Sequence, residues 1–395
     1  MNEHKNKVSA LFEIFLVSTK LGLTSFGGPI AHLGYFHEEY IRKRKWMDEK
    51  SYADLVALAQ FLPGPSSSQV GIGIGTMRAG VLGGLTAFVG FTFPSVLLLI
   101  FFALLLQGVN IANSSWLHGF RIVALTVVAH AVYGMAQKLT TDVKTKTIAL
   151  FALTTMLIWQ TRITQVTILF IAAILGYLLY KDRAVNDERQ ATFPISRNFG
   201  AICLALFFVF LFALPIFREI THSQNWDLFD SVYRSGALVF GGGHVVLPLL
   251  EVEFVPTGWM SEYTFLAGFS AAQAVPGPLF TFAAYLGTVM DGVSGGLLAI
   301  AAIFLPGILL IFGALPFWDF LRKNAKIQGA LVGLNAAVVG ILGAAFYNPI
   351  WRNSIVEPID FAFAALLFGM LSFWKLPPWI VVITGSIGGF LLALV

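Results

Sequence analysis

Apolar residues run along most of the chain in stretches long enough to cross a lipid bilayer. A transmembrane helix needs roughly 17–25 mostly apolar residues. The stretches lack the alternation typical of a β-barrel, so we predict helical spans. We expect six long spans and two short helical hairpins. The spans are 80–106, 119–137, 198–216, 292–315, 327–346 and 376–395, and the hairpins pair 147–160 with 163–180 and 361–374 with 376–395.

Composition supports the same class of protein. Hydrophobic residues make up 57% of the 395 positions and charged residues 12%, with a mean hydropathy of +0.78. A soluble domain is about half apolar and about a quarter charged. We therefore predict an all-α polytopic membrane protein. The isoelectric point near 9.1 reflects basic residues in short loops, which orient a membrane protein, so we expect no nucleic-acid partner. The single cysteine, Cys203, predicts packing rather than a disulfide.

Both halves of the chain carry the same motifs in the same order. "KLGLTSFGG" (20–28) aligns with "RSGALVFGG" (234–242), and "WMDEKSY" (46–52) aligns with "WMSEYTF" (259–265). A Gln-x-x-Pro-Gly-Pro segment follows at the same distance in each half. The sequence therefore predicts a tandem duplication. We divide the chain into an N-terminal repeat 1–180, a linker 181–197, an extra span 198–216 and a C-terminal repeat 222–395.

Loop charges indicate that the two repeats face opposite sides of the membrane. The loop 42–50 has five basic residues, whereas its counterpart 251–262 has three glutamates and no Lys or Arg. Basic loops stay in the cytoplasm, so we place 42–50 and the linker 181–197 there. The extra span 198–216 then inverts the second repeat.

Glycine and proline break the apolar sequence at matching places in the two repeats. We predict re-entrant hairpins at these breaks, because the strongly basic loops then share one side of the membrane. A long kinked helix that crosses fully is the alternative. The breaks are Gly27-Gly28-Pro29, Pro63-Gly64-Pro65, Gly241-Gly242-Gly243 and Pro276-Gly277-Pro278.

Inverted repeats with broken helices are typical of secondary transporters, whose substrate binds where the breaks meet. A new helix N-terminus offers unpaired N–H groups and partial positive charge, which favour an anion. Lys20 and Arg234 lie at equivalent positions in apolar helices and are candidates for binding a divalent anion. In the alternative, each snorkels to an interface or pairs with a carboxylate such as Glu13. The full set of candidate binding residues is Lys20, Gly27, Gly28, Gln60, Pro63, Gly64, Pro65, Ser66, Ser67, Ser68, Arg234, Gly241, Gly242, Gly243, His244, Gln273, Pro276, Gly277 and Pro278.

These motifs resemble the chromate ion transporter (CHR) family. The resemblance rests on "SFGGP" (25–29), "WMDEKSY", "AQFLPGPSSSQ" (59–69), "VFGGGHVVLPLL" (239–250) and "AQAVPGP" (272–278), and it covers essentially the whole chain. It implies a long-chain, two-domain member that exports chromate across the bacterial inner membrane, with halves oppositely oriented. Sulfate, similar in charge and shape, is then an expected competitor or alternative substrate. The second half has Gly243-His244 where the first has Pro29-Ile30, so the half-sites differ.

Energy coupling is open at this stage. The sequence has no Walker A motif, so we expect an ion gradient or the membrane potential to drive transport. Candidate proton carriers are Glu39, Asp54 and Glu253, with His32, His37, Glu251 and His244 considered beside them. We expect no cofactor, no metal site and no catalytic residues. The expected partners are a chromate or sulfate-like oxyanion, the lipid bilayer and, as an open alternative, a second copy in a homodimer. The rival classes are a passive oxyanion channel and an intramembrane enzyme.

Overall fold

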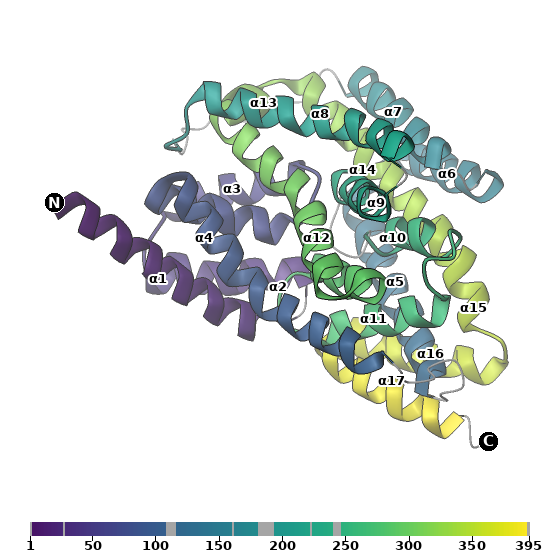
Figure 1. Ribbon diagram of the computed structural model, residues 1–395. Coiled ribbons are helices and arrows are strands. Elements are labelled where there is room, and N and C mark those ends of the chain that lie inside the picture. Colours follow the sequence, from purple (N-terminus) through teal and green to yellow (C-terminus); the bar gives the residue numbers. More distant parts are fainter. Residues whose placement is uncertain are drawn as a thin grey trace. The chain divides into compact units, whose positions relative to one another are not determined.

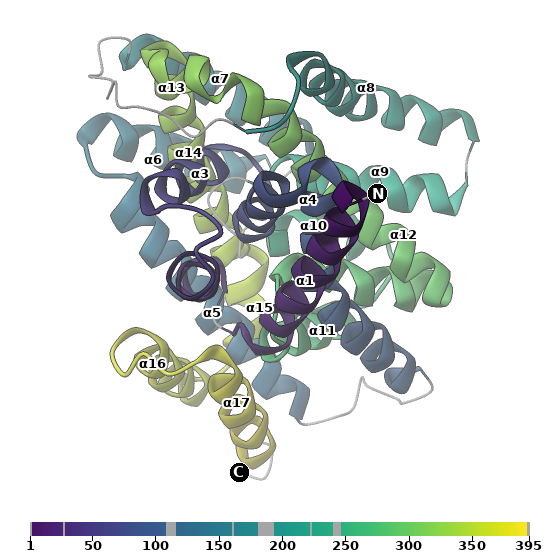
Figure 2. The ribbon, with the colours of Figure 1, turned by 90° about the vertical axis from the view of Figure 1, so that its left-hand side faces the viewer.

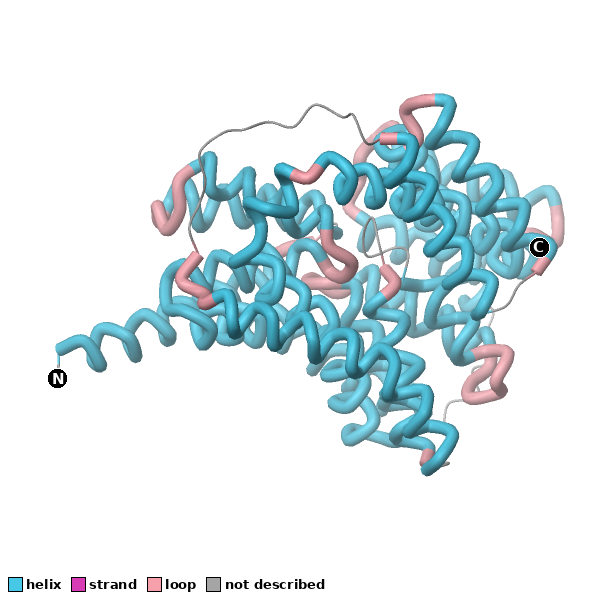
Figure 3. Tube along the Cα trace, turned by 90° about the horizontal axis from the view of Figure 1, so that it is seen from above, coloured by secondary structure: helices cyan, strands magenta, loops and turns pink. Residues whose placement is uncertain are grey.

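Helices make up the whole regular structure of the described residues in the computed structural model, and no strand occurs among them (Figure 3). The structure describes residues 2–26, 28–107, 116–159, 162–180, 193–221, 223–239 and 246–392. The predicted all-α membrane fold is confirmed. The chain forms two compact units, each assembled from several segments.

The first unit draws on both halves of the chain. It comprises Met1–Gly108, Glu188–Val246 and Val275–Asp319. Helix α1 packs along α4, and α12 packs against α4, α8 and α9 (Figure 1). Its elements are α1 (Asn2–Thr24), α2 (Gly28–Phe36), the π-helix η1 (His37–Lys43), α3 (Glu49–Phe61), α4 (Ser66–Leu106), α8 (Arg197–Thr221), α9 (Gln224–Ala237), the 3₁₀ turns η4 (Leu279–Thr281) and η5 (Leu315–Phe317), and α12 (Phe282–Ala314).

The second unit contains Val109–Asp187, Leu247–Ala274 and Phe320–Val395. Helix α14 packs against α6 and α7, and α5 packs against α16 and α17, which Figure 2 shows side by side. Glycines allow close contact here: a Cβ on Gly333 of α14 would overlap the backbone of α7. Its elements are α5 (Trp116–Leu139), α6 (Val143–Ile158), α7 (Arg162–Leu179), α10 (Val246–Phe254), α11 (Glu262–Ala274), α13 (Trp318–Lys323), α14 (Ala325–Ala345), η6 (Phe346–Trp351), α15 (Arg352–Ser354), α16 (Pro358–Ser372) and α17 (Pro378–Leu392).

Five helical stretches among the described residues are long and apolar enough to span a membrane. Many of their exposed side chains are apolar; on α8, for example, Phe212 is 68% exposed. Such surfaces suit lipid rather than water. The chain is therefore a multi-pass membrane protein. The five stretches are Ser66–Leu106, Arg121–Leu139, Arg197–Thr221, Leu279–Phe317 and Ala325–Asn348.

One predicted span begins later than expected. We predicted a span over 376–395, but α17 begins at Pro378 and is described to Leu392, and residues 393–395 lie outside the described part of the chain. Two adjacent prolines explain the late start. A proline inside a helix removes a hydrogen bond and clashes with the preceding turn, whereas the first helical position, which Pro378 takes, tolerates it.

Two of the long helices are folded back sharply near their N-terminal ends. Gly80 in α4 has φ +67° and Gly292 in α12 has φ +60°, values that favour glycine. On either side of the first break, Gly75 and Gly83 approach so closely that a Cβ on one would overlap the backbone of the other. Gly287 and Gly295 do the same around the second break. Each long helix is thus a short arm packed onto a long arm, and the long arms begin at the predicted starts of the spans.

Candidate functional site

The two Pro-Gly-Pro turns make reciprocal backbone hydrogen bonds in the first unit. The Gly64 N–H donates to the carbonyl oxygen of Val239 at 2.7 Å, and the Gly277 N–H donates to that of Ser25 at 2.9 Å. Val239 and Ser25 are equivalent residues, each two positions before a Gly-Gly pair. Each turn is therefore tied to the segment that precedes the glycine break of the other half of the chain.

Glycine is required at the centre of both turns. Gly64 has φ +114° and Gly277 has φ +106°, which is strained for residues with a Cβ. Space is also limited: a Cβ on Gly64 would lie 3.2 Å from Gly307 Cα, and one on Gly277 would lie 2.6 Å from Ser95 Oγ. Gly307 and Ser95 each follow a proline within a long helix, α12 and α4 respectively. The residue after the proline of each long helix thus packs against one of the turns, Gly307 through its backbone and Ser95 through its side chain.

Helix α4 begins directly after the first turn and presents a buried N-terminus. Pro65 caps it, and its first internal hydrogen bond runs from the Gln69 N–H to the Pro65 carbonyl at 3.0 Å. The N–H groups of Ser66, Ser67 and Ser68 therefore have no partner within the helix. All three serines are buried. The arrangement places partial positive charge and hydroxyl groups together inside the protein.

Gln69 connects this helix end to the second half of the chain. Its side-chain Nε2 donates to the Pro63 carbonyl at 2.9 Å and to the Gly307 carbonyl at 3.3 Å. The side chain is fully buried. Gln69 was absent from our predicted site, although it follows the serine run directly and aligns with the apolar Phe282. A polar residue in one half at a position that is apolar in the other half was the sequence signal that could have identified Gln69.

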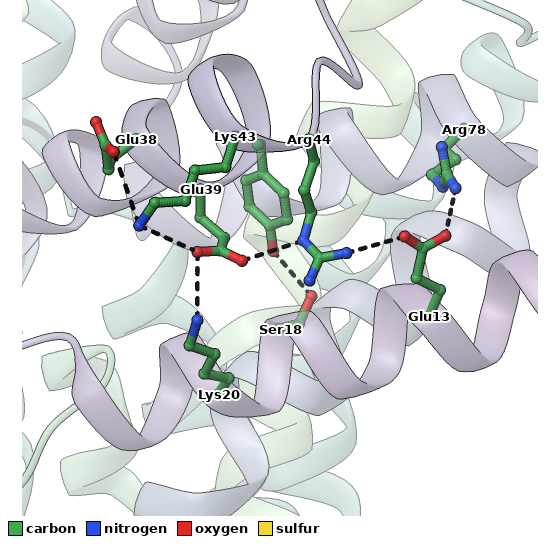
Figure 4. A network of polar contacts seen from close by, with 9 residues as sticks. Glu13, Ser18, Lys20, Glu38, Glu39, Lys43, Arg44 and Arg78 are labelled. Atoms are coloured by element: carbon green, nitrogen blue, oxygen red, sulfur yellow. Dashed lines mark hydrogen bonds and ion pairs between the residues drawn. The ribbon is translucent and has the colours of Figure 1, made fainter.

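Lys20 belongs to an ion-pair network that joins α1 to η1 (Figure 4). Its Nζ lies 3.4 Å from the buried carboxylate of Glu39, and the Lys20 side chain is 61% exposed. Arg44 donates to Glu39 at 3.1 Å and to Glu13 at 2.9 Å. Arg78 continues the chain of contacts from the other oxygen of Glu13. The predicted alternative of carboxylate pairing therefore holds for Lys20, with Glu39 as partner instead of Glu13.

Arg234 pairs within its own helix. Its Nη2 donates to Asp230 Oδ2 at 2.6 Å, one turn earlier in α9. Arg218 of α8 lies 3.5 Å from the same carboxylate and 3.2 Å from Asp227. The buried Asp230 therefore offsets the charge of Arg234 in this structure. A direct role for Lys20 and Arg234 in anion binding stays a prediction.

The other predicted residues are spread over several elements. On α3, Gln60 is exposed and Asp54 half-buried, whereas Gln273 on α11 is half-buried and Glu253 on α10 buried. Five predicted residues lie outside the described part of the chain: Gly27, Gly241, Gly242, Gly243 and His244. Within the described residues, no group of three or more His, Cys, Asp or Glu side chains is arranged to hold a metal ion.

Comparison with known proteins identifies related sequences. A family model described as "Chromate transporter" matches residues 12–177 and again 226–390. A "Chromate transport protein" of Pseudomonas aeruginosa is 27% identical over 84% of this chain and 79% of its own length. A protein of the same description from Cupriavidus metallidurans is 24% identical over 98% of this chain and 94% of its own. An uncharacterized transporter of Methanocaldococcus jannaschii is 27% identical over 94% of this chain and 90% of its own. No solved structure matches significantly.

Proposed function

The chain belongs to the chromate transporter family, and from this premise we propose that it is a secondary transporter. It exports chromate or a similar tetrahedral oxyanion from the cell. Family membership supports chromate transport as the general activity. The observation that carries the finer proposal is the buried N-terminus of α4, held by reciprocal turns between the halves. Substrate is bound there, where helix ends and hydroxyl groups favour an anion.

The reciprocal contacts also support two repeats related by inverted symmetry. A two-fold relation makes residue i of one copy meet residue j of the other, and the reverse. Gly64 with Val239 and Gly277 with Ser25 follow this rule. The opposite loop charges at 42–50 and 251–262 favour a symmetry axis lying in the membrane plane. Alternating access then arises when one repeat rocks against the other around the site.

The membrane potential favours export of a dianion from a cytoplasm that is negative inside. Moving one charge through 100 mV is worth about 2.3 kcal/mol, so a dianion gains roughly twice that. Export thus needs no ATP, and a proton gradient can add to the driving force. We retain Glu39, Asp54 and Glu253 as candidate proton carriers and place the protein in the bacterial inner membrane.

Chromate flux in liposomes that contain the purified protein tests the proposal. We expect saturable flux that responds to an imposed pH gradient. Lys20→Gln is expected to lower it about tenfold or more, equivalent to about 1.4 kcal/mol, if this cation faces the substrate. Lys43→Gln is the matched control, because Lys43 also pairs with Glu39, at 3.9 Å, and is 58% exposed. It is expected to retain flux near the wild-type level. Arg234→Gln is measured in parallel, with chromatographic homogeneity as its folding control.

Each other outcome removes a defined part of the proposal. Flux that fails to saturate and ignores the pH gradient would indicate a passive channel. Sulfate flux without chromate flux would support oxyanion transport but exclude chromate as the substrate. Equal flux in Lys20→Gln and the wild type would remove Lys20 from the site.

A further inference from the structure

We propose that the chain holds one oxyanion site, that the ligands of this site all come from the first half of the chain, and that His32 is one of them. The inference rests on the proposed function and deepens it. It adds to the proposed site a set of uncharged donors around the N-terminus of α4, and α2 contributes His32 to this set.

His32 lies on α2 beside the start of α4 and is 1% exposed. One ring nitrogen, Nδ1, lies 3.3 Å from Ser67 Oγ in the first turn of α4. The ring also packs edge-on to Phe91 of α4, with the ring centroids 5.4 Å apart. These contacts fix the plane of the imidazole. Its second nitrogen, Nε2, has no hydrogen-bond partner among the described residues.

Two further buried hydroxyl groups come from residues close to these in the chain. Ser68 follows Ser67 in α4, and Ser25 lies between the end of α1 and the start of α2, the helix that carries His32. Ser68 Oγ and Ser25 Oγ are buried, and neither has a hydrogen-bond partner within the described part of the chain. Leaving a buried hydroxyl group without a hydrogen-bond partner costs free energy. A ligand rich in acceptor oxygens removes this cost.

Ser68 lies in the first turn of α4 and His32 contacts Ser67 of the same turn, at a helix end that itself favours an anion. The N–H groups of Ser66, Ser67 and Ser68 have no partner within α4, and the helix dipole puts partial positive charge there. A buried imidazole and buried hydroxyl groups add side-chain donors at this end. The combination matches a tetrahedral oxyanion, whose oxygens accept several hydrogen bonds at once.

The positions of the second half that align with His32, Ser66 and Ser67 provide no side-chain hydrogen-bond donors. His32 aligns with Val246, and Ser66 and Ser67 align with Leu279 and Phe280. All three second-half side chains are apolar and buried. At the same place in the second half, Thr281 turns its hydroxyl to the Pro278 carbonyl at 2.7 Å. The second turn therefore acts as a scaffold for the first, and a duplicated chain binds one anion.

Equilibrium dialysis tests both the stoichiometry of one anion per chain and the role of His32 as a ligand. It uses the full-length protein in detergent, with radiolabelled chromate and competing sulfate. We expect one bound anion per chain. His32→Asn keeps a polar atom near the position of Nδ1 and removes Nε2, whereas His32→Gln places an amide N–H near Nε2. We expect binding to weaken about 10- to 100-fold in His32→Asn, as for one lost hydrogen bond to a charged group. His32→Gln is expected to recover most of the affinity.

A second histidine–serine pair supplies the matched control. His130 Nδ1 lies 2.9 Å from Ser372 Oγ in the second unit, so His130→Asn makes the same change in the unit that does not contain the proposed ligands. It is expected to bind chromate like the wild type. Thermal unfolding of each variant, followed without ligand, separates lost binding from lost folding.

The outcomes separate this inference from the proposed function. Unchanged affinity in folded His32→Asn, or two anions per chain, overturns the inference and leaves oxyanion transport standing. If the wild-type protein binds neither chromate nor sulfate, the proposed function falls and the inference falls with it. Weakening in His32→Asn, recovery in His32→Gln and a stoichiometry of one support the inference.

Discussion

Glu39 is the carboxylate that three basic side chains of α1, η1 and the residue after η1 share. Its side chain is 8% exposed, yet it faces Lys20, Lys43 and Arg44. Burial of a carboxylate is costly unless it is paired and hydrogen-bonded. Here Arg44 donates to it at 3.1 Å and links it to Glu13. The exposed members of the network contribute little each, because water screens them.

Neutralising Glu39 is expected to destabilise the protein more than neutralising its neighbour. We predict that Glu39→Gln lowers the free energy of unfolding by about 1–3 kcal/mol, since hydrogen bonds to charged groups are worth that much. Glu38 is 48% exposed and pairs with Arg42 and Lys43 at 3.6 and 3.7 Å. Glu38→Gln should therefore cost less than about 0.5 kcal/mol. Thermal unfolding in one detergent measures both, and equal losses would contradict the prediction.

At the scale of helices, the sharp folds in α4 and α12 set where the Pro-Gly-Pro turns lie. Ala79 and Gly80, like Asp291 and Gly292, have non-helical backbone angles inside otherwise continuous helices. Each fold returns a short arm along a long one, which brings the turn back toward the centre of the unit. Small residues at the crossing allow this approach, as in other membrane helix pairs.

Gly80→Ala is expected to lower stability by about 1–2 kcal/mol, the cost of holding a residue with a Cβ in a left-handed conformation. Nothing lies within 4 Å of a Cβ at Gly80, so the effect isolates the backbone. Gly134 of α5 is the control. It too has open space around an added Cβ, but it lies inside a regular helix. Gly134→Ala should be neutral or stabilising by up to about 1 kcal/mol. Thermal unfolding again distinguishes the two, and a loss in Gly134→Ala equal to that in Gly80→Ala would show that the backbone angle is not the cause.

Across the whole molecule, both halves of the chain pack around the candidate site, although its proposed ligands come from the first half. The first unit contains residues of both halves, and α12 from the second half packs against α4 from the first. The reciprocal bonds at Gly64 and Gly277 also join one half to the other. A core of this kind is buried only when both halves are present.

Dividing the chain within the linker 181–197 provides a test at this scale. We predict that fragments 1–185 and 186–395, produced together, copurify and support chromate flux in liposomes. Either fragment produced alone should give no flux, because its share of the core and of the turns lacks a partner. The uncut protein, purified and reconstituted in parallel, sets the reference. Full flux from one fragment would show that a half-chain completes the site by itself.

Local sequence determined the class of protein and the positions of its breaks. The apolar spans, the glycines and prolines, and the matching motifs each act within a few residues, so they can be read without contacts. Helix α4 accordingly begins after Pro65, where the sequence places a break, and the long arms begin at Gly80 and Gly292, where it places the starts of two spans. The sharp folds at these two glycines were not predicted. The doubled match of the family model fits the two sets of motifs.

Tertiary structure alone decided which distant groups meet. Lys20 pairs with Glu39 and Arg234 with Asp230, although the sequence offered other carboxylates. It also set His32 against Ser67 and crossed each Pro-Gly-Pro turn to the opposite half. These choices depend on how helices far apart in the chain pack together. A side chain's own sequence neighbours carry no record of that packing, so the fold class could be predicted from the sequence, whereas the ligands of the site needed the packed structure.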